Sequence, residues 1–142
     1  MSSNVETKVK QLASLVLQSE AEAVNEVITV LEDLRETHDF KEDVHGSLVV
    51  AVSEAINNSV FHGNKQDPQK KVYVDIELRN QYRLVVRVKD EGNGFNPDAL
   101  EDPVSPENLF SPGGRGVYFM RTLADEVVFH NEGREVELVF NI

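Results

Sequence analysis

Hydrophobic residues recur at helical spacing in two stretches of the first half of the chain. From Glu20 to Glu36 the apolar side chains lie three or four positions apart, which predicts a helix with one buried side (Val24, Val27, Ile28, Leu31 and Leu34). A second helix is predicted from near Asp43 to Gly63, with Leu48, Val52, Ala55, Ile56 and Ser59 on its buried side. Ser19 and Glu22 match a capping-box signature at the start of the first helix, and Gly63 suits the end of the second.

From Lys71 onwards the pattern changes to alternation of apolar and polar residues, which predicts half-buried strands. The first of these strands covers residues 71–79, Asn80 and Gln81 turn the chain, and the second strand runs from Tyr82 to Lys89. The inward-facing residues of this predicted hairpin are Val72, Val74, Ile76, Leu78, Leu84, Val86 and Val88.

Further elements are predicted towards the two ends of the chain. Residues 10–19 are rich in Leu and Val and indicate a first strand, whereas 127–130 and 134–140 indicate a final pair of strands around "NEG". The segment "GVYFMRTLAD", residues 116–125, indicates a short helix. Residues 91–114 show little periodicity, and an unstructured connection longer than roughly 12–15 residues is usually functional or disordered. With no repeat and no linker, residues 1–142 are interpreted as one α/β domain.

The charge of the chain limits the classes of ligand. A formal net charge of −11 argues against direct binding of nucleic acid, because the phosphate backbone would be repelled. A phosphate-rich ligand would therefore need a metal ion or backbone N–H groups to offset the repulsion. There is no cysteine, no signal peptide is recognisable, and no apolar run approaches the roughly 20 residues of a membrane span. We expect a cytoplasmic protein that does not contact a membrane.

The stretch "EAINNSVFHGNK", residues 54–65, carries polar residues that a purely structural helix would not need. Asn58 lowers helix stability relative to a good helix former. Glu54 and Asn58 are four positions apart, so they project from one helical face about a turn from each other. Two plainer interpretations stay open: Asn58 could be a buried residue bonded to the backbone, and His62 a structural residue at a helix end.

Two glycine clusters flank the long segment. In "DEGNGF", residues 90–95, Gly92 and Gly94 would let the backbone turn and approach a ligand closely. In "GGRGVYFMR", residues 113–121, three glycines precede a predicted helix, whose free N–H groups suit phosphate. This second cluster is neither a Walker motif nor a Rossmann turn. Taken singly, the first cluster could be only a tight turn and the second only a flexible loop entry.

Together and in this order, the three motifs resemble those of the GHKL superfamily of ATP-binding domains, shared by gyrase, the heat-shock chaperone, histidine kinases and MutL. "EAINNSVFHGNK" is similar to the N box, "DEGNGF" to the first glycine box and "GGRGVYFMRTLADEV" to the second. The chain resembles most the bacterial anti-sigma factors that are also serine kinases in partner-switching systems, over essentially its whole length. The resemblance implies a Bergerat-type ATP-binding fold, an α+β two-layer sandwich with helices on one face of a mixed, mostly antiparallel sheet, and a lid at residues 91–114.

The resemblance also implies roles for individual residues. Glu54 is the general base that accepts a proton from the attacking hydroxyl, Asn58 coordinates Mg²⁺ at the phosphates, and Asp90 accepts a hydrogen bond from the adenine amino group. The other residues of the ATP site are Gly92 and Gly94 at the adenine, and Gly113, Gly114, Arg115 and Gly116 at the phosphates. Members of this branch often have a basic residue in the lid, but residues 91–114 contain no Lys or Arg. Arg115 and then Lys65 are the nearest candidates, unless both are plain surface charges.

Three functions are compatible with these residues. The leading hypothesis is a bacterial anti-sigma factor that regulates transcription: it binds ATP and Mg²⁺, phosphorylates a serine of an anti-anti-sigma (STAS-type) partner, holds a sigma factor and forms a homodimer. The second is a nucleotide-dependent binding module without kinase activity, in which Glu54 is idle. The third, the ATP-binding half of a histidine kinase, needs a phosphoacceptor helix domain for which these 142 residues leave no room.

Overall fold

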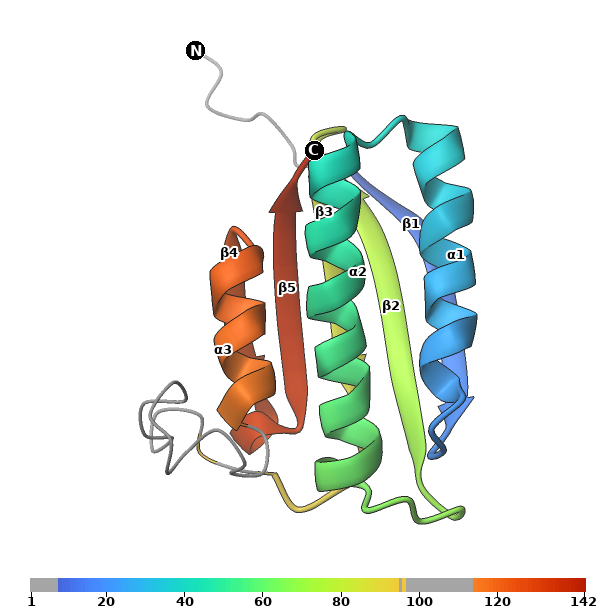
Figure 1. Cartoon of the computed structure of the whole chain (residues 1–142), viewed down its shortest axis with the longest axis vertical. Helices are drawn as coiled ribbons and strands as arrows, with labels where there is room; N and C mark the ends of the chain where they lie inside the picture. The colour runs from blue at the N-terminus through green and yellow to red at the C-terminus, as the bar shows by residue number, and fades with distance from the viewer. Residues whose placement is uncertain (1–7, 95, 97–113) are drawn as a thin grey trace.

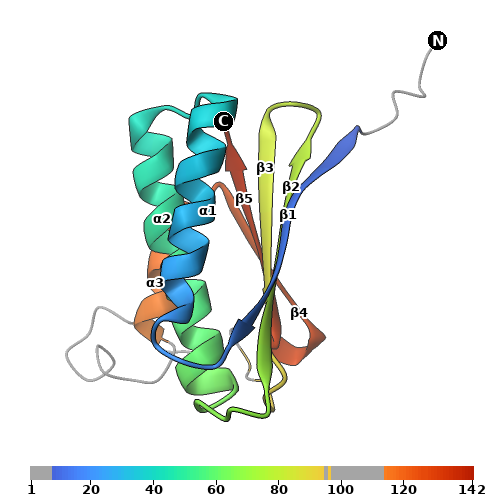
Figure 2. The same cartoon turned by 90° about the vertical axis from the view of Figure 1, so that its right-hand side faces the viewer.

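The computed structural model describes residues 8–94, 96 and 114–142. Within them, helices pack on one face of a five-stranded sheet, as the side view shows (Figure 2). The strands are β1 (Val9–Gln18), β2 (Lys71–Arg79), β3 (Arg83–Lys89), β4 (Glu126–His130) and β5 (Glu135–Asn141). The helices are α1 (Ala23–His38), α2 (Glu42–Asn57) and α3 (Gly114–Leu123), and a π-helical turn, Asn58–Gly63, continues α2. The expected two-layer α/β class is confirmed.

The order of the strands is β1-β2-β3-β5-β4, and every pairing among the described strands is antiparallel (Figure 1). The chain turns at Asn80 and Gln81 as predicted, and both have positive φ angles, of 54° and 69°. The turn is one residue longer than predicted, because Arg79 pairs with Arg83, so that Tyr82 belongs to the turn and β3 begins at Arg83. The β2 residue Val74 lies opposite Leu15 of β1 and Val88 of β3. This register places the alternating apolar residues of neighbouring strands on one face of the sheet.

The core lies between that face and the helices. The predicted inward residues of β2 and β3 are all buried, and so are Val27 and Leu31 of α1. From α2 and the turn after it, Leu48, Val52, Ala55, Ile56 and Ser59 are buried as predicted. The segment 116–125 was predicted to be helical, and α3 adds Val117 and Met120 to the core. Among the described residues, none of the helices is long and apolar enough to cross a membrane.

The predicted capping box at the first helix is wrong. The helix begins at Ala23, and Glu22 at its N-cap makes no hydrogen bond through its side chain. The Ser19 hydroxyl instead donates to the Lys70 carbonyl and accepts a hydrogen bond from Asn64 Nδ2 at 2.9 Å. These contacts with residues far along the chain take the place of the local one, because Ser19 lies before the turn that precedes the helix.

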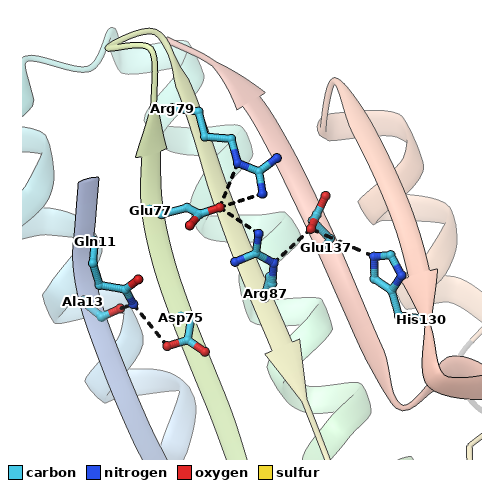
Figure 3. Close-up of polar contacts among 8 residues, drawn as sticks. All are labelled: Gln11, Ala13, Asp75, Glu77, Arg79, Arg87, His130 and Glu137. Carbon is cyan, nitrogen blue, oxygen red and sulfur yellow. Dashed lines mark hydrogen bonds and ion pairs between the residues drawn. The ribbon is translucent and has the colours of Figure 1, made fainter. Parts of the chain in front are cut away.

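The face of the sheet away from the helices carries a network of ion pairs (Figure 3). Glu77 accepts hydrogen bonds from Arg79 Nε at 2.8 Å and from Arg87 at 2.7 Å, and Arg87 Nε donates to Glu137 at 3.0 Å. Burial alone would raise the pKa of Glu77, but the hydrogen bonds and charges of Arg87 and Arg79 outweigh it, so this pKa lies below its ordinary value of 4.5. Glu77 is therefore held as an anion in the centre of the network.

Candidate functional site

Three segments that are distant in the sequence meet at one end of the molecule. They are the end of α2 with its π-helical turn, the segment that leaves β3, and the start of α3, at the lower end of the view in Figure 1. These segments carry the three motifs that the sequence singled out. The fold therefore brings together one site from residues 54–65, 90–94 and 114–116.

Glu54 and Asn58 lie one turn apart, as their spacing predicts. The Asn58 backbone N–H donates to the carbonyls of Glu54 and Ala55, and both side chains are half-buried. The Nδ2 atom of Asn58 is buried, and no hydrogen-bond partner for it occurs in the part of the chain that the structure describes. The interpretation of Asn58 as a residue that bonds to the backbone through its side chain thus gains no support from this structure. An unpaired buried amide is costly in a purely structural role.

The carboxamide of Asn58 faces the beginning of α3. A Cβ atom added to Gly116 would lie 2.9 Å from Asn58 Nδ2 and 3.1 Å from Oδ1. Position 116 thus has no room for a side chain while Asn58 keeps its place. Gly114 is the first residue of α3, so the N–H groups at this helix end lie beside the carboxamide. This is the arrangement in which a metal-bound phosphate would meet both a side-chain oxygen and a helix N-terminus.

The donor set fits Mg²⁺ held together with a phosphate ligand. Within the described ranges, no cluster of three or more His, Asp or Glu side chains forms a metal cage. Mg²⁺ usually keeps several waters and takes one or two protein oxygens beside substrate phosphates, so it needs no such cage. The carboxamide of Asn58 can present its oxygen by rotation about its last side-chain bond, and it adds no charge.

Asp90 is a buried acid at the end of β3. Its residue is 6% exposed, and its carboxylate accepts hydrogen bonds from the Gly92 N–H at 2.8 Å and from the Ser59 side chain. Burial raises the pKa of Asp90 above its ordinary value of 3.8, although those hydrogen bonds and the charges of Arg134 and Lys70 oppose the rise. A buried carboxylate with a perturbed pKa beside glycines is a candidate for recognising a polar group of a ligand.

Close backbone packing fixes the surroundings of Asp90. A Cβ atom at Gly63 would lie 2.4 Å from Asp90 Oδ2, and one at Gly92 would lie 2.0 Å from the Gly63 carbonyl oxygen. Gly94 has a positive φ of 79° and passes close to the Glu132 carbonyl. The predicted helix end at Gly63 is confirmed, but the reason is this contact with Asp90. Gly92 and Gly94 pack against the backbone of other segments, so glycine is required at both positions for packing. This requirement is separate from the close approach to a ligand that the sequence predicts.

Two residues of this site were missed by the sequence interpretation. Asn64 is 1% exposed, and its Oδ1 accepts the Glu91 N–H at 2.8 Å. Arg134 follows the turn 131–133; its Nε donates to the Gly92 carbonyl at 2.8 Å and its own carbonyl accepts the Asp90 N–H at 2.9 Å. In the sequence, the one feature that could have pointed to Asn64 is its position directly after Gly63. For Arg134, the corresponding feature is that a basic residue begins a predicted strand next to a turn.

The remaining predicted residues are less closely tied to this geometry. Arg115 is exposed, and its guanidinium carbon lies 5.4 Å from the centre of the Phe119 ring. Lys65 and His62 are also exposed. Gly113 and most of the predicted lid at 91–114 lie outside the described residues.

Comparison with known protein families identifies the class of the domain. Residues 17–140 match the model of the histidine kinase-like ATPase domain, from the end of β1 to the end of β5. The chain therefore belongs to the histidine kinase-like ATPase domain family.

Two similar curated proteins carry the same name. The serine-protein kinase RsbW of Bacillus subtilis is 38% identical over 101 residues, which are 67% of this chain and 60% of that protein. The protein of the same name from Listeria innocua is 31% identical over 104 residues, 68% of this chain and 66% of the relative. The matched region thus spans somewhat under two thirds of these curated relatives.

A solved structure shows the same fold. The crystal structure of the RsbU and RsbW domains of Rv1364c from Mycobacterium tuberculosis superposes with a TM-score of 0.66 at 16% identity. It covers 91% of this chain and 31% of the other. At this identity the likeness concerns the fold alone.

Proposed function

We propose that this chain binds ATP with Mg²⁺ and transfers the γ-phosphate to a serine of a protein partner. The observation that carries the proposal is the meeting of Asp90, the Glu54–Asn58 pair and the start of α3 at one end of the fold. Membership of an ATPase domain family and the name serine-protein kinase of the relatives support it.

Different residues of the site recognise the adenine, the phosphates and the Mg²⁺ ion of the nucleotide. In this proposal Asp90 accepts a hydrogen bond from the exocyclic amino group of adenine, which requires the ionised carboxylate. The backbone N–H groups of Gly114 and Gly116 donate to phosphate oxygens, with Gly113 and Arg115 next to them. The oxygen of Asn58 would hold Mg²⁺, which when bound neutralises phosphate charge.

Glu54 acts on the protein substrate. Its carboxylate accepts the proton of the serine hydroxyl as that oxygen attacks the γ-phosphorus. A serine O–P bond forms, the bond from the γ-phosphorus to the bridging oxygen breaks, and ADP leaves with that oxygen. Glu54 then releases its proton to water. Phosphoryl transfer depends mostly on such positioning and charge stabilisation, so few catalytic side chains are needed.

We further propose the biological role that the sequence resemblance implies. The partner that receives the phosphate is an anti-anti-sigma protein of STAS type, and the chain also holds a sigma factor, so phosphorylation controls which partner is bound. The protein acts as a homodimer in the bacterial cytoplasm. Light scattering on the purified chain tests the dimer, and a pull-down with and without ATP tests the exchange of partners.

A second function is favoured by one observation. No Lys or Arg lies between residues 91 and 114, and the guanidinium of Arg115 lies over Phe119. A site without a basic side chain at the γ-phosphate suits a module that binds nucleotide and partner but transfers no phosphate. Incubation of the chain and its partner with γ-labelled ATP separates the two functions: labelled phosphoserine on the partner supports the kinase, and nucleotide binding without label supports the module.

A further inference from the structure

Asn64 joins four segments of the chain beside Asp90. Its Nδ2 donates to Ser19 Oγ at 2.9 Å, directly after β1, and to the Lys71 carbonyl at 2.8 Å, at the start of β2. Its Oδ1 accepts the Glu91 N–H at 2.8 Å, and its own N–H donates to the Ser59 carbonyl at 2.8 Å, within the π-helical turn. Both amide hydrogens and the amide oxygen are therefore used inside the protein.

The π-helical turn gives Asn64 this position. The bond from the Asn64 N–H to the Ser59 carbonyl joins residues five apart, so the wide turn brings Asn64 and Ser59 to the same side. Ser59 reaches the Asp90 carboxylate from that side. The turn thus supports Asp90 through Ser59 and the next residue, Glu91, through Asn64.

The amides of three consecutive residues are held by three different acceptors. The Asp90 N–H donates to the Arg134 carbonyl, the Glu91 N–H to Asn64 Oδ1, and the Gly92 N–H to the Asp90 carboxylate. Of the two side-chain acceptors, the Asp90 carboxylate belongs to the segment 90–92 itself, whereas Asn64 Oδ1 comes from outside that segment. Without it, the peptide that follows Asp90 would lose this anchor to the helical layer, and the Asp90 carboxylate would be held only by the Gly92 N–H and the Ser59 side chain.

We infer that Asn64 is a positioning residue for adenine recognition: it fixes the Glu91 amide and thereby aims the Asp90 carboxylate at the adenine amino group. This inference rests on the proposed function. Asn64 touches no nucleotide atom in this scheme, so its effect is confined to the base end of the ligand. Its loss weakens the discrimination of adenine from guanine, which presents an oxygen in place of the amino group.

The test compares Asn64→Ala with Ser19→Ala by calorimetric titration with ATP and with GTP in excess Mg²⁺. Ser19→Ala is the matched control, because it removes a buried partner of Asn64 but leaves the bond to Glu91 in place. We expect both variants to melt at a lower temperature than the wild type. Of the two variants, only Asn64→Ala should weaken ATP binding, by about tenfold, which is a change in binding free energy of about one hydrogen bond. Its binding of GTP should change little.

Each outcome of these measurements supports or overturns the inference. A selective loss for ATP in Asn64→Ala supports the inference, and equal ATP-to-GTP preference in both variants and the wild type overturns it. If Asn64→Ala does not fold, hydrogen exchange of the wild type without nucleotide decides: a Glu91 amide as slow as those of β3 supports the anchor, and one as fast as an open loop overturns it. If the wild type itself shows no preference for ATP, the proposed function fails, and this inference with it.

Discussion

Gly63 lies directly against the carboxylate of Asp90, so closely that a Cβ atom at position 63 would lie 2.4 Å from Oδ2. We expect Gly63→Ala to displace Asp90, to destabilise the fold by about 1–3 kcal/mol as overpacking does, and to weaken ATP binding. Gly46→Ala is the matched control, because nothing lies within 4 Å of the added atom in the exposed part of α2. The control should gain roughly 0.5–1 kcal/mol in helix stability. Denaturant unfolding measures the stability of the two variants, and titration with ATP measures their affinity. Unaltered ATP binding in Gly63→Ala would argue against Asp90 as the residue that binds adenine.

The raised pKa of Asp90 makes ATP binding sensitive to acid. The hydrogen bond from adenine needs the ionised carboxylate, so affinity should fall as the pH is lowered through the pKa of Asp90, which lies above 3.8. The ligand-free fold responds with the opposite sign: stability from the protonated carboxyl is present below 3.8 and is lost as the pH rises through the raised pKa. Titrations across this range should show the loss of affinity in the wild type and a weak, flat profile in Asp90→Asn. Parallel profiles for the two proteins would contradict the role.

Asn58→Ala should abolish most of the effect of Mg²⁺ on ATP binding. The metal then loses its protein ligand and keeps only water and phosphate oxygens. The control is Asn57→Ala, a half-buried neighbour on the same helix. ATP titrations with Mg²⁺ and with a chelator test this; an equal gain from Mg²⁺ in both variants would make Asn58 a structural residue.

Glu77 should govern acid stability on the other face of the sheet. Because its pKa is lowered in the fold, its contribution is present above 4.5 and is lost as the pH falls through the lower, folded value. Glu77→Gln should cost about 1–3 kcal/mol at neutral pH, as charged hydrogen bonds do. Asp75 lies on the same face and is bonded to Gln11 (Figure 3). It also accepts a hydrogen bond from Ser14, and Asp75→Asn should cost less than Glu77→Gln. Urea unfolding at pH 7 and pH 4 distinguishes them, and a similar acid response in the two variants would contradict this assignment.

The sequence predicted the elements well where the signal is local. Alternation from Val72 to Val88 determined both strands and their inner face, because a strand that buries one side needs every second residue apolar. Asn58 and Glu54 could be placed on one helical face from spacing alone. Prediction failed where a distant partner decides the contact: the Ser19 hydroxyl bonds to Lys70 and Asn64 rather than to its own helix.

Asn64 and Arg134, which hold the residues of the site in place, could not be predicted from the sequence for the same reason. The bond between Asn64 and Glu91 joins residues 27 positions apart, and that between Arg134 and Gly92 joins residues 42 apart. The residues next to Asn64 or Arg134 in the sequence give no sign of the distant residue to which each is bonded. The motifs therefore revealed the residues expected to touch the ligand, whereas the residues that hold them in place required the folded chain.

Glu54→Gln tests the central claim most directly, because it keeps the size and hydrogen bonding of the side chain and removes only the basic carboxylate. The measurement is the single-turnover rate of label transfer from γ-labelled ATP to the serine partner, with Glu42→Gln at the exposed start of α2 as the control. We expect the rate to fall by a factor on the order of 10² in Glu54→Gln, with ATP·Mg²⁺ binding within a few-fold of the wild type and no change in the control. Full transfer by Glu54→Gln, or no transfer by the wild type, would contradict the account.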